Sequence, residues 1–416
     1  MARVSNPKRR KLADLLLAQI FPLVASMIMT FATAAILGTS GRGVLALVIS
    51  SAGLVGALGY LSLQVGIVRA FRLGDVSAPK RGFKIAFLIA ILVLVLGIVP
   101  VMLNPGVRIG LFDGAMIVMV ACGGALVIVN LVVLRTYQGL GYSRVFRDAW
   151  LIQSVVFPML GVPVALAFHS PFPVVACWYV ALALSTAFAL SRRNERREER
   201  PGGSHVPRID ILKTSIAAHV GVAGQQLLHS ADVVVLGLMV SASAVGVYSI
   251  AVPIAGMIWV FSEALSLIAF DSGSRRATAA DQRAQRSKLT RLNFIVGVLA
   301  CVAIGLGSTI LIPLLLPKYV AAVPLILILL PGVLIQGYAR IGLSSILTSG
   351  SKRSLVLIGL TSAALCVLYL PFVGALGATG AAIASSVIYS VQTFVVLVVI
   401  RKRMKNLELE EANVAE

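Results

Sequence analysis

The chain has 416 residues, of which 58% are hydrophobic and only 12% are charged. Soluble domains average about 45–50% apolar and about a quarter charged residues, so this composition excludes an ordinary soluble domain. The formal net charge of +20 would suit a nucleic-acid partner, but the positions of the basic residues give another explanation.

The apolar residues gather in long, uninterrupted runs. A helix needs roughly 20 apolar residues to cross a bilayer core of about 30 Å, and the runs lack the alternation of a membrane β-barrel. The sequence therefore predicts an all-α integral membrane protein of about twelve transmembrane helices. In chain order the predicted spans are 15–37, 44–70, 85–103, 115–134, 149–168, 173–190, 215–240, 245–270, 293–315, 322–347, 354–372 and 378–400.

The basic residues alternate between the connections in a way that fixes a predicted orientation. If the N-terminus is placed inside, 32 of the 36 Lys and Arg residues fall on the cytoplasmic side. The other face carries only Arg42, Arg108 and Lys318, and Arg340 lies within a span. Cytoplasmic loops of membrane proteins carry such an excess of basic residues. We expect a cytoplasmic-membrane protein with both termini in the cytoplasm and no nucleic-acid partner.

The two halves of the chain show weak internal similarity. The glycines of 43–53 match those of 246–256 at a shift of 203, and 141–144 resembles 350–353 at a shift of 209. An even number of spans per half gives repeats of one orientation, with a substrate site between them. The sequence therefore predicts two six-helix bundles around a central cavity. The predicted parts are an N-terminal bundle (1–192), a cytoplasmic charged linker (193–212), a C-terminal bundle (213–403) and a cytoplasmic tail (404–416).

The seventh predicted span carries polar residues on one face. Gln225, His229 and Asp232 are spaced i, i+4, i+7, which places them on the same side of a helix. Ionisable groups at membrane depth are costly and face a cavity or a partner. Asp232 is either hydrogen-bonded to a neighbouring helix or a cavity acid that binds a cation or a proton. His229 is either a packing residue or part of the same cavity.

The eighth and tenth predicted spans add further candidates. Glu263 is the acid well inside the eighth span, toward the cytoplasmic side. Gln336, Arg340 and Ser344 recur at intervals of four residues along the tenth span. Arg340 either snorkels to the headgroups or faces inward with this polar stripe and binds substrate.

Three other arginines are weaker candidates for substrate contact. Arg69 and Arg135 end the second and fourth predicted spans, where a long basic side chain either snorkels or reaches a cavity. Arg42 lies between Gly41 and Gly43 at the predicted outer surface. It is either part of an exposed turn or a contact for a headgroup or a sugar.

No pattern of residues indicates catalysis. The chain has no GxxxxGK[ST] loop for nucleotide phosphates, and the cysteines lie singly in different spans, without the spacing of a metal site. The sequence predicts a protein that is not an enzyme and needs no cofactor or metal.

Several segments resemble one transporter family. The segments 232–237 (DVVVLG) and 245–251 (VGVYSIA) look like the passage between the seventh and eighth spans of polysaccharide flippases. So do 316–319 (LPKY) with 324–327 (PLIL), and the Gly-rich segment 374–382 is similar to the family's entry to the last span. The chain thus resembles the polysaccharide-transport branch of the multidrug/oligosaccharidyl-lipid/polysaccharide (MOP) exporter superfamily.

This resemblance implies a flippase for a polyprenyl-pyrophosphate-linked oligosaccharide or polysaccharide precursor, working by alternating access. Its expected partners are the lipid-linked glycan, membrane lipids and proteins of glycan synthesis or polymerisation. The alternatives are a drug exporter or a peptidoglycan-precursor exporter of the same superfamily and, from another class, a glycan polymerase or assembly protein. A major facilitator transporter is disfavoured, because 74–82 lacks the charged pattern that follows the second span in that family.

The charge distribution predicts the topology of reporter fusions. Fusions after Arg197 and Arg283 should report a cytoplasmic position, and fusions near Pro171 and Ser243 should report the external face. A strong external signal after Arg197 or Arg283 would contradict the twelve-span arrangement.

Overall fold

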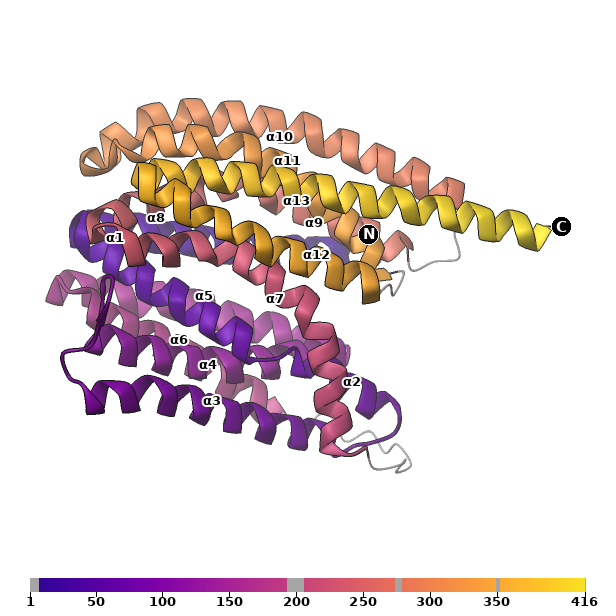
Figure 1. The fold of residues 1–416 in the computed structure, drawn as a ribbon, viewed down its shortest axis with the longest axis horizontal. Coiled ribbons are helices and arrows are strands. Elements are labelled where there is room, and N and C mark those ends of the chain that lie inside the picture. Colours follow the sequence, from indigo (N-terminus) through magenta and orange to yellow (C-terminus); the bar gives the residue numbers. More distant parts are fainter. Residues whose placement is uncertain (1–6, 193–205, 274–278, 349–351, 416) are drawn as a thin grey trace, which may run out of the picture. The chain divides into compact units, whose positions relative to one another are not determined.

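The computed structural model describes residues 7–192, 206–273, 279–348 and 352–415, almost all of them helical (Figure 1). The chain forms two compact units. The first comprises the chain to His219 together with 240–246, and the second comprises 220–239 and the chain from Val247 onward.

The first unit contains the elements of the N-terminal half. They are α1 (Pro7–Gly59), α2 (Leu63–Arg72), α3 (Ala78–Leu103), β1 (Arg108–Ile109), β2 (Phe112–Asp113), α4 (Gly114–Gly139), α5 (Ser143–Phe168), α6 (Pro171–Ser191) and the first part of α7 (Arg208–Met239).

The second unit contains the rest of α7 and the C-terminal half. Its elements are α8 (Ala242–Gly256), whose first residues belong to the first unit, α9 (Ile258–Gly273), α10 (Ala279–Leu315), η2 (Pro317–Tyr319), α11 (Ala322–Thr348), α12 (Lys352–Leu365), η3 (Cys366–Leu368) and α13 (Tyr369–Ala415).

Ten helical segments of the described chain are long and apolar enough to cross a membrane, and each predicted span overlaps one of them. Two segments, Phe21–Arg72 and Arg353–Lys402, each hold two predicted spans. The helices within them break at Gly38 (φ 66°) and Gly377 (φ 58°). No atom lies within 4 Å of the position that a Cβ would occupy at Gly38, so lack of space does not require glycine there. The positive φ does favour glycine. The prediction of about twelve apolar membrane helices is therefore confirmed.

Three predicted spans are not single α-helices: 245–270 divides between α8 and α9, 354–372 between α12, η3 and α13, and 44–70 between α1 and α2. The span 44–70 is interrupted between α1 and α2, where Leu61 and Ser62 both have a φ of 49°. The Ser62 hydroxyl lies 3.1 Å from Nδ1 of His219 on α7, and Tyr60 packs edge-on against the same ring. Contacts with α7 therefore hold a left-handed turn that apolarity alone does not predict.

Each unit packs its helices around its own buried residues. In the first unit α4 packs against α1, α3 and α6, and α5 packs against α1 and α6. In the second unit α11 packs against α9, α10 and α13, and Figure 1 shows α10, α11 and α13 running side by side. The boundaries predicted for the two bundles, and the cavity between them, stay predictions.

The connection 104–113 contains a short hairpin in addition to the predicted helices. Ile109 pairs with Phe112 and Arg108 with Asp113 in antiparallel register. The Asp113 carboxylate then accepts a hydrogen bond of 2.8 Å from the backbone N–H of Met116 and caps α4. A capping carboxylate satisfies one of the free N–H groups at a helix start.

The matched glycines of the internal repeat touch each other. A Cβ at Gly43 would lie 1.8 Å from the carbonyl oxygen of Ala242, and a Cβ at Gly246 would lie 1.9 Å from that of Thr39. Residues 39 and 242 are related by the same shift of 203 as the two glycines. The contact is therefore reciprocal, and both positions exclude any side chain because helix backbones meet there.

The connection between α2 and α3 is organised by a buried carboxylate. Asp75 is 4% exposed, pairs with Arg81, and accepts hydrogen bonds from Ser77 and from the N–H of Val206 at 2.8 Å. Burial raises the pKa of Asp75, but the hydrogen bonds from Val206, Ser77 and Arg81 and the charge of Arg81 outweigh it, so the pKa lies below the ordinary 3.8. The charged carboxylate thus connects the backbone of Val206 to Arg81 near the start of α3.

Asp75→Asn should destabilise the protein by about 3 kcal/mol, because it removes one charge of a buried ion pair with Arg81. A carboxylate with a lowered pKa stabilises the fold above its unfolded pKa, and this stabilisation is lost as the pH falls through the folded pKa. The difference in thermal stability between wild type and variant should therefore hold at neutral pH and shrink below pH 3.8.

The matched control is Asp148→Asn, which removes an ion pair with Arg147 whose side chains are 34% and 42% exposed. Exposed pairs contribute about 0–1 kcal/mol. Equal losses in the two variants would contradict the role given to Asp75.

Candidate functional site

Five of the predicted site residues come together within the second unit. Gln225 and His229 on α7 and Gln336 and Arg340 on α11 line one small cavity. Glu263 on α9 joins them through its ion pair with Arg340. Helical spacing predicts that Gln225 and His229 share one helix face and that Gln336 and Arg340 share another. In the structure both faces border the same cavity.

Arg340 is held by a carboxylate and an aromatic ring. Its Nη1 donates to Oε1 of Glu263, and its guanidinium carbon lies 4.3 Å from the ring centre of Trp259. Trp259 is itself fixed by a hydrogen bond of 3.1 Å from its ring N–H to the carbonyl of Val333. An ion pair and a cation–π contact together stabilise a guanidinium away from water. The guanidinium of Arg340 therefore points toward Glu263 and Trp259 of the second unit.

Two aromatic rings pack against His229. His229 packs against Trp259 at a ring distance of 5.3 Å and against Tyr389 at 6.0 Å. Trp259 and Tyr389 meet nearly perpendicularly at 5.6 Å. Edge-to-face packing of this kind fixes ring orientation, so the imidazole of His229 is held in place beside Arg340.

A chain of side-chain amides crosses the site. Gln336 donates to Gln392 at 3.4 Å, and Gln392 donates to Gln225 at 2.8 Å. Gln225 in turn donates to the hydroxyl of Ser362 at 3.0 Å. These residues come from α11, α13, α7 and α12, so the amide chain links four helices through polar contacts.

The cavity beside these groups has a volume of about 20 Å³, room for about one water molecule. Three buried polar atoms of its lining have no hydrogen-bond partner among the described residues: Nδ1 of His229, Oε1 of Gln336 and Nε of Arg340. Buried polar atoms of this kind are normally bonded to ordered water or a ligand. The cavity therefore has donors and an acceptor for a small polar molecule, and it is too small for a pyrophosphate in this conformation.

Asp232 lies further along α7 in a separate network. Its Oδ2 accepts a hydrogen bond of 2.8 Å from the hydroxyl of Tyr248 on α8. That hydroxyl lies 3.1 Å from Ser385 Oγ, which is 3.0 Å from the hydroxyl of Tyr369. Asp232 is only 1% exposed. Asp232 is thus hydrogen-bonded to a neighbouring helix, and its role in binding a cation or a proton stays a prediction.

The remaining predicted site residues lie in the first unit. Arg42 is buried and donates to Thr33 at 3.1 Å and to Thr30 at 3.4 Å, so it is not part of an exposed turn. Arg135 is exposed, bonded to Gln138 at 2.9 Å and placed over the ring of Phe146. Neither lies in the cluster around Arg340.

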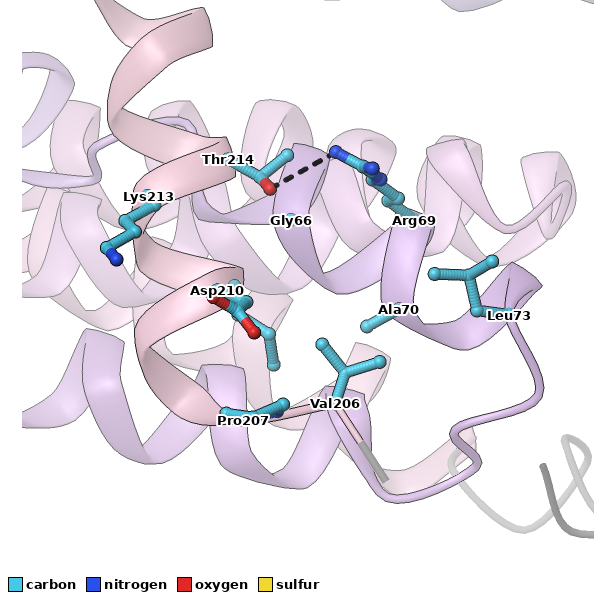
Figure 2. Close-up of a pocket in the computed structure, with 10 residues that line it drawn as sticks. Gly66, Arg69, Ala70, Leu73, Val206, Pro207, Asp210, Lys213 and Thr214 are labelled. Carbon is cyan, nitrogen blue, oxygen red and sulfur yellow. Dashed lines mark hydrogen bonds between the residues drawn. The ribbon is translucent and has the colours of Figure 1, made fainter. Parts of the chain in front are cut away.

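Arg69 is part of a different, larger pocket. Figure 2 shows this pocket between α2 and the start of α7, where Arg69 reaches toward Thr214 with a separation of 3.5 Å. The predicted site residues thus fall into one cluster and the separate network of Asp232 in the second unit, and scattered positions in the first.

The sequence reasoning missed several residues of the cluster. Gln392 lies in the apolar span 378–400, and the criterion that selected Gln336, a polar residue within a span, would have found it. Trp259 and Tyr389 carry no such signal, because aromatic residues are common in membrane spans. Their roles depend on the packing of α7, α9 and α13 against one another.

The chain matches no protein-family profile and no curated protein. Solved structures do match it. An inward-facing multidrug resistance MATE family transporter of the MOP superfamily aligns with a TM-score of 0.64, over 94% of this chain and 99% of that one, at 14% identity. An outward-facing structure of such a transporter aligns with a TM-score of 0.63, over 97% of each chain, at 15% identity.

A MOP superfamily transporter from Pyrococcus furiosus also aligns, with a TM-score of 0.60 and 14% identity, over 95% of this chain and 96% of that one. Likeness at such low identity is likeness of fold. The protein therefore has the helical-bundle fold of MOP superfamily transporters, and its function has to be argued from its own site.

The exposures of the Arg340–Glu263 pair predict an asymmetry in stability. The Arg340 side chain is 21% exposed and that of Glu263 is 45% exposed. Glu263→Gln should therefore cost more than Arg340→Gln, about 1–2 kcal/mol against less than about 1 kcal/mol, because the better buried charge loses its partner.

The double variant should recover part of the loss, since it leaves no charge unpaired. Thermal unfolding of the four proteins in one detergent measures this cycle. Strictly additive losses would contradict a direct interaction between the two side chains.

Proposed function

We propose that the protein is a membrane transporter that works by alternating access and carries a polyprenyl-pyrophosphate-linked oligosaccharide or polysaccharide precursor across the cytoplasmic membrane. The fold supports the transporter class, because transporters with this fold have been solved in both inward-facing and outward-facing conformations. The resemblance of segments such as 232–237 and 374–382 supports the substrate class.

The observation that carries the proposal is a permanent cation within a membrane-spanning helix, surrounded by polar side chains. A pyrophosphate and its sugars lose hydration in hydrocarbon unless other polar groups replace the water. Arg340, with Gln336 and Gln392 beside it, offers such groups on the inner side of a span. A guanidinium grips phosphate oxygens through two parallel hydrogen bonds.

In the proposed mechanism Glu263 occupies the place of the substrate. Its carboxylate is bonded to Arg340, and the adjoining cavity of about 20 Å³ leaves no room for a pyrophosphate. Binding of the lipid-linked glycan exchanges one anion for another on the guanidinium and releases Glu263. A ligand shifts a conformational equilibrium only through its different affinity for the two states, and this exchange supplies such a difference.

Asp232 is proposed to serve the same cycle as the acid that binds a cation or proton. It is bonded to the hydroxyl of Tyr248, which connects through Ser385 to Tyr369, so loss or gain of a charge there would reorder a network joining α7, α8 and α13. The proposed partners are the lipid-linked glycan, membrane lipids and proteins of glycan synthesis.

A strain that lacks the protein should accumulate a lipid-linked glycan, and variants should restore export in a graded way. We expect Arg340→Lys to be partly active and Arg340→Gln nearly inactive, although inserted in normal amount. Loss of one charge-assisted hydrogen bond lowers affinity for the glycolipid by roughly ten- to a hundredfold. Glu263→Gln should bind the glycolipid more tightly, because Arg340 no longer has a competing anion, and yet turn over slowly.

Arg135→Gln is the matched control, since Arg135 is an exposed arginine outside the cluster, and it should export normally. Equal affinity of wild type and Arg340→Gln for the glycolipid would end the assignment of Arg340. A deletion strain that accumulates no glycolipid and becomes sensitive to drugs would favour the drug exporter, and an accumulated peptidoglycan precursor would identify that substrate. Flipped but unpolymerised glycan would favour a polymerase.

A further inference from the structure

A pocket of about 380 Å³ lies in the first unit. Figure 2 shows it between α2 and the start of α7. Its volume is at the lower end of the range for small-molecule sites. The charged and polar residues of its lining are Arg69, Asp210, Lys213 and Thr214, and the apolar ones include Ala70, Leu73, Val206 and Ile211.

The walls of the pocket are fixed by close contacts. A Cβ at Gly66 would lie 2.2 Å from the carbonyl oxygen of Ile211 and 2.5 Å from Oγ of Ser215, so α2 and α7 approach there as only glycine allows. The Gly66 N–H also donates to Ser215 Oγ at 3.3 Å. On the other side, the bond from Val206 to Asp75 holds the segment before α7. The shape of the pocket is therefore fixed by backbone contacts and hydrogen bonds on both sides.

The guanidinium of Arg69 and the carboxylate of Asp210 both line this pocket and do not form a salt bridge with each other. Arg69 has a hydrogen bond only to the neutral hydroxyl of Thr214, at the limiting distance of 3.5 Å. Neither Arg69 nor Asp210 forms a salt bridge with any residue that the structure describes. Lys213 adds a second, exposed cation at the rim. The pocket thus offers donors for an anion and an acceptor for a hydrogen-bond donor.

The position of the pocket along the spans points to lipid headgroups. Arg69 and Arg72 lie in the last turn of α2, and α7 begins at Arg208. The predicted orientation places these helix ends at the cytoplasmic surface. Basic pockets between membrane helices on that side bind lipid headgroups. The apolar side chain of Leu73, which is 60% exposed, lies beside these basic groups.

We propose that this pocket binds a phospholipid headgroup carrying both a phosphate and a hydrogen-bond donor, as phosphatidylethanolamine does. The phosphate pairs with the guanidinium of Arg69 and with Lys213, and the ammonium donates to the carboxylate of Asp210. Phosphatidylcholine has the same charges, but its methylated ammonium has no N–H to donate. The inference rests on the predicted orientation of the chain and not on its transport substrate.

The test is direct lipid binding to the full chain, purified in detergent and titrated with phosphatidylethanolamine or phosphatidylcholine of identical acyl chains. We expect phosphatidylethanolamine to bind about fivefold more tightly, because a partly exposed charge-assisted bond contributes modestly. Arg69→Gln should weaken its binding roughly fivefold, the typical effect of one basic residue at a membrane surface. Asp210→Asn should remove the preference for ethanolamine over choline.

Arg72→Gln is the matched control, since Arg72 is an exposed arginine one turn along the same helix and does not line the pocket. It should bind both lipids as wild type does. Arg69→Lys keeps the charge but lacks the planar, bidentate donors of a guanidinium, so it should bind phosphatidylethanolamine with intermediate affinity. This variant also controls for misfolding of Arg69→Gln. Equal binding of the two lipids, or equal loss in the Arg69→Gln and Arg72→Gln variants, would overturn the proposal.

A third titration separates a membrane lipid from the transported carrier. Polyprenyl phosphate has a phosphate and no ammonium, so it should bind more weakly than phosphatidylethanolamine at this pocket. Tighter, Arg69-dependent binding of polyprenyl phosphate would overturn the headgroup assignment. Neither result depends on export activity, so failure here is distinguishable from failure of the proposed flippase function.

Discussion

Every polar side chain within a membrane span has to find its partner inside the protein, and this constraint organises both units. Lipid offers no hydrogen bonds, so an unpaired polar group costs several kcal/mol there. Asp232 is therefore bonded to the Tyr248 hydroxyl, which is itself bonded to Ser385, and Arg340 contacts Glu263 and a tryptophan ring. Arg42 follows the same rule through the hydroxyls of Thr30 and Thr33.

The same constraint gives the Arg340–Glu263 pair its functional interest. A partly exposed ion pair contributes little net stability, so its value lies in what can replace one partner. A phosphate competes for the guanidinium with the same kind of hydrogen bonds that the carboxylate makes. Beside the pair, buried polar atoms of His229 and Gln336 have no hydrogen-bond partner among the described residues. The second unit therefore leaves polar groups at this point that its described side chains do not bond.

Close backbone contacts form the second organising feature. The reciprocal contact of Gly43 with Ala242 and of Gly246 with Thr39 joins segments that the sequence repeat relates to each other. Small residues at membrane helix interfaces let backbones approach and gain dispersion contacts, which drive association where the hydrophobic effect does not. At Gly66 the same kind of approach shapes the pocket at the start of α7.

The sequence by itself determined the spans, because the length and apolarity of each run are local and additive properties that decide membrane insertion. It also determined that Gln225 and His229 share one face of a helix, and Gln336 and Arg340 another, since helical periodicity follows from spacing. Only the tertiary structure decided which groups from other helices meet them, such as Gln392 and Trp259. It also decided that Asp75 bonds Val206 across 131 positions of the chain. Such pairings depend on how helices pack, and packing is a sum over many weak contacts that no local pattern encodes.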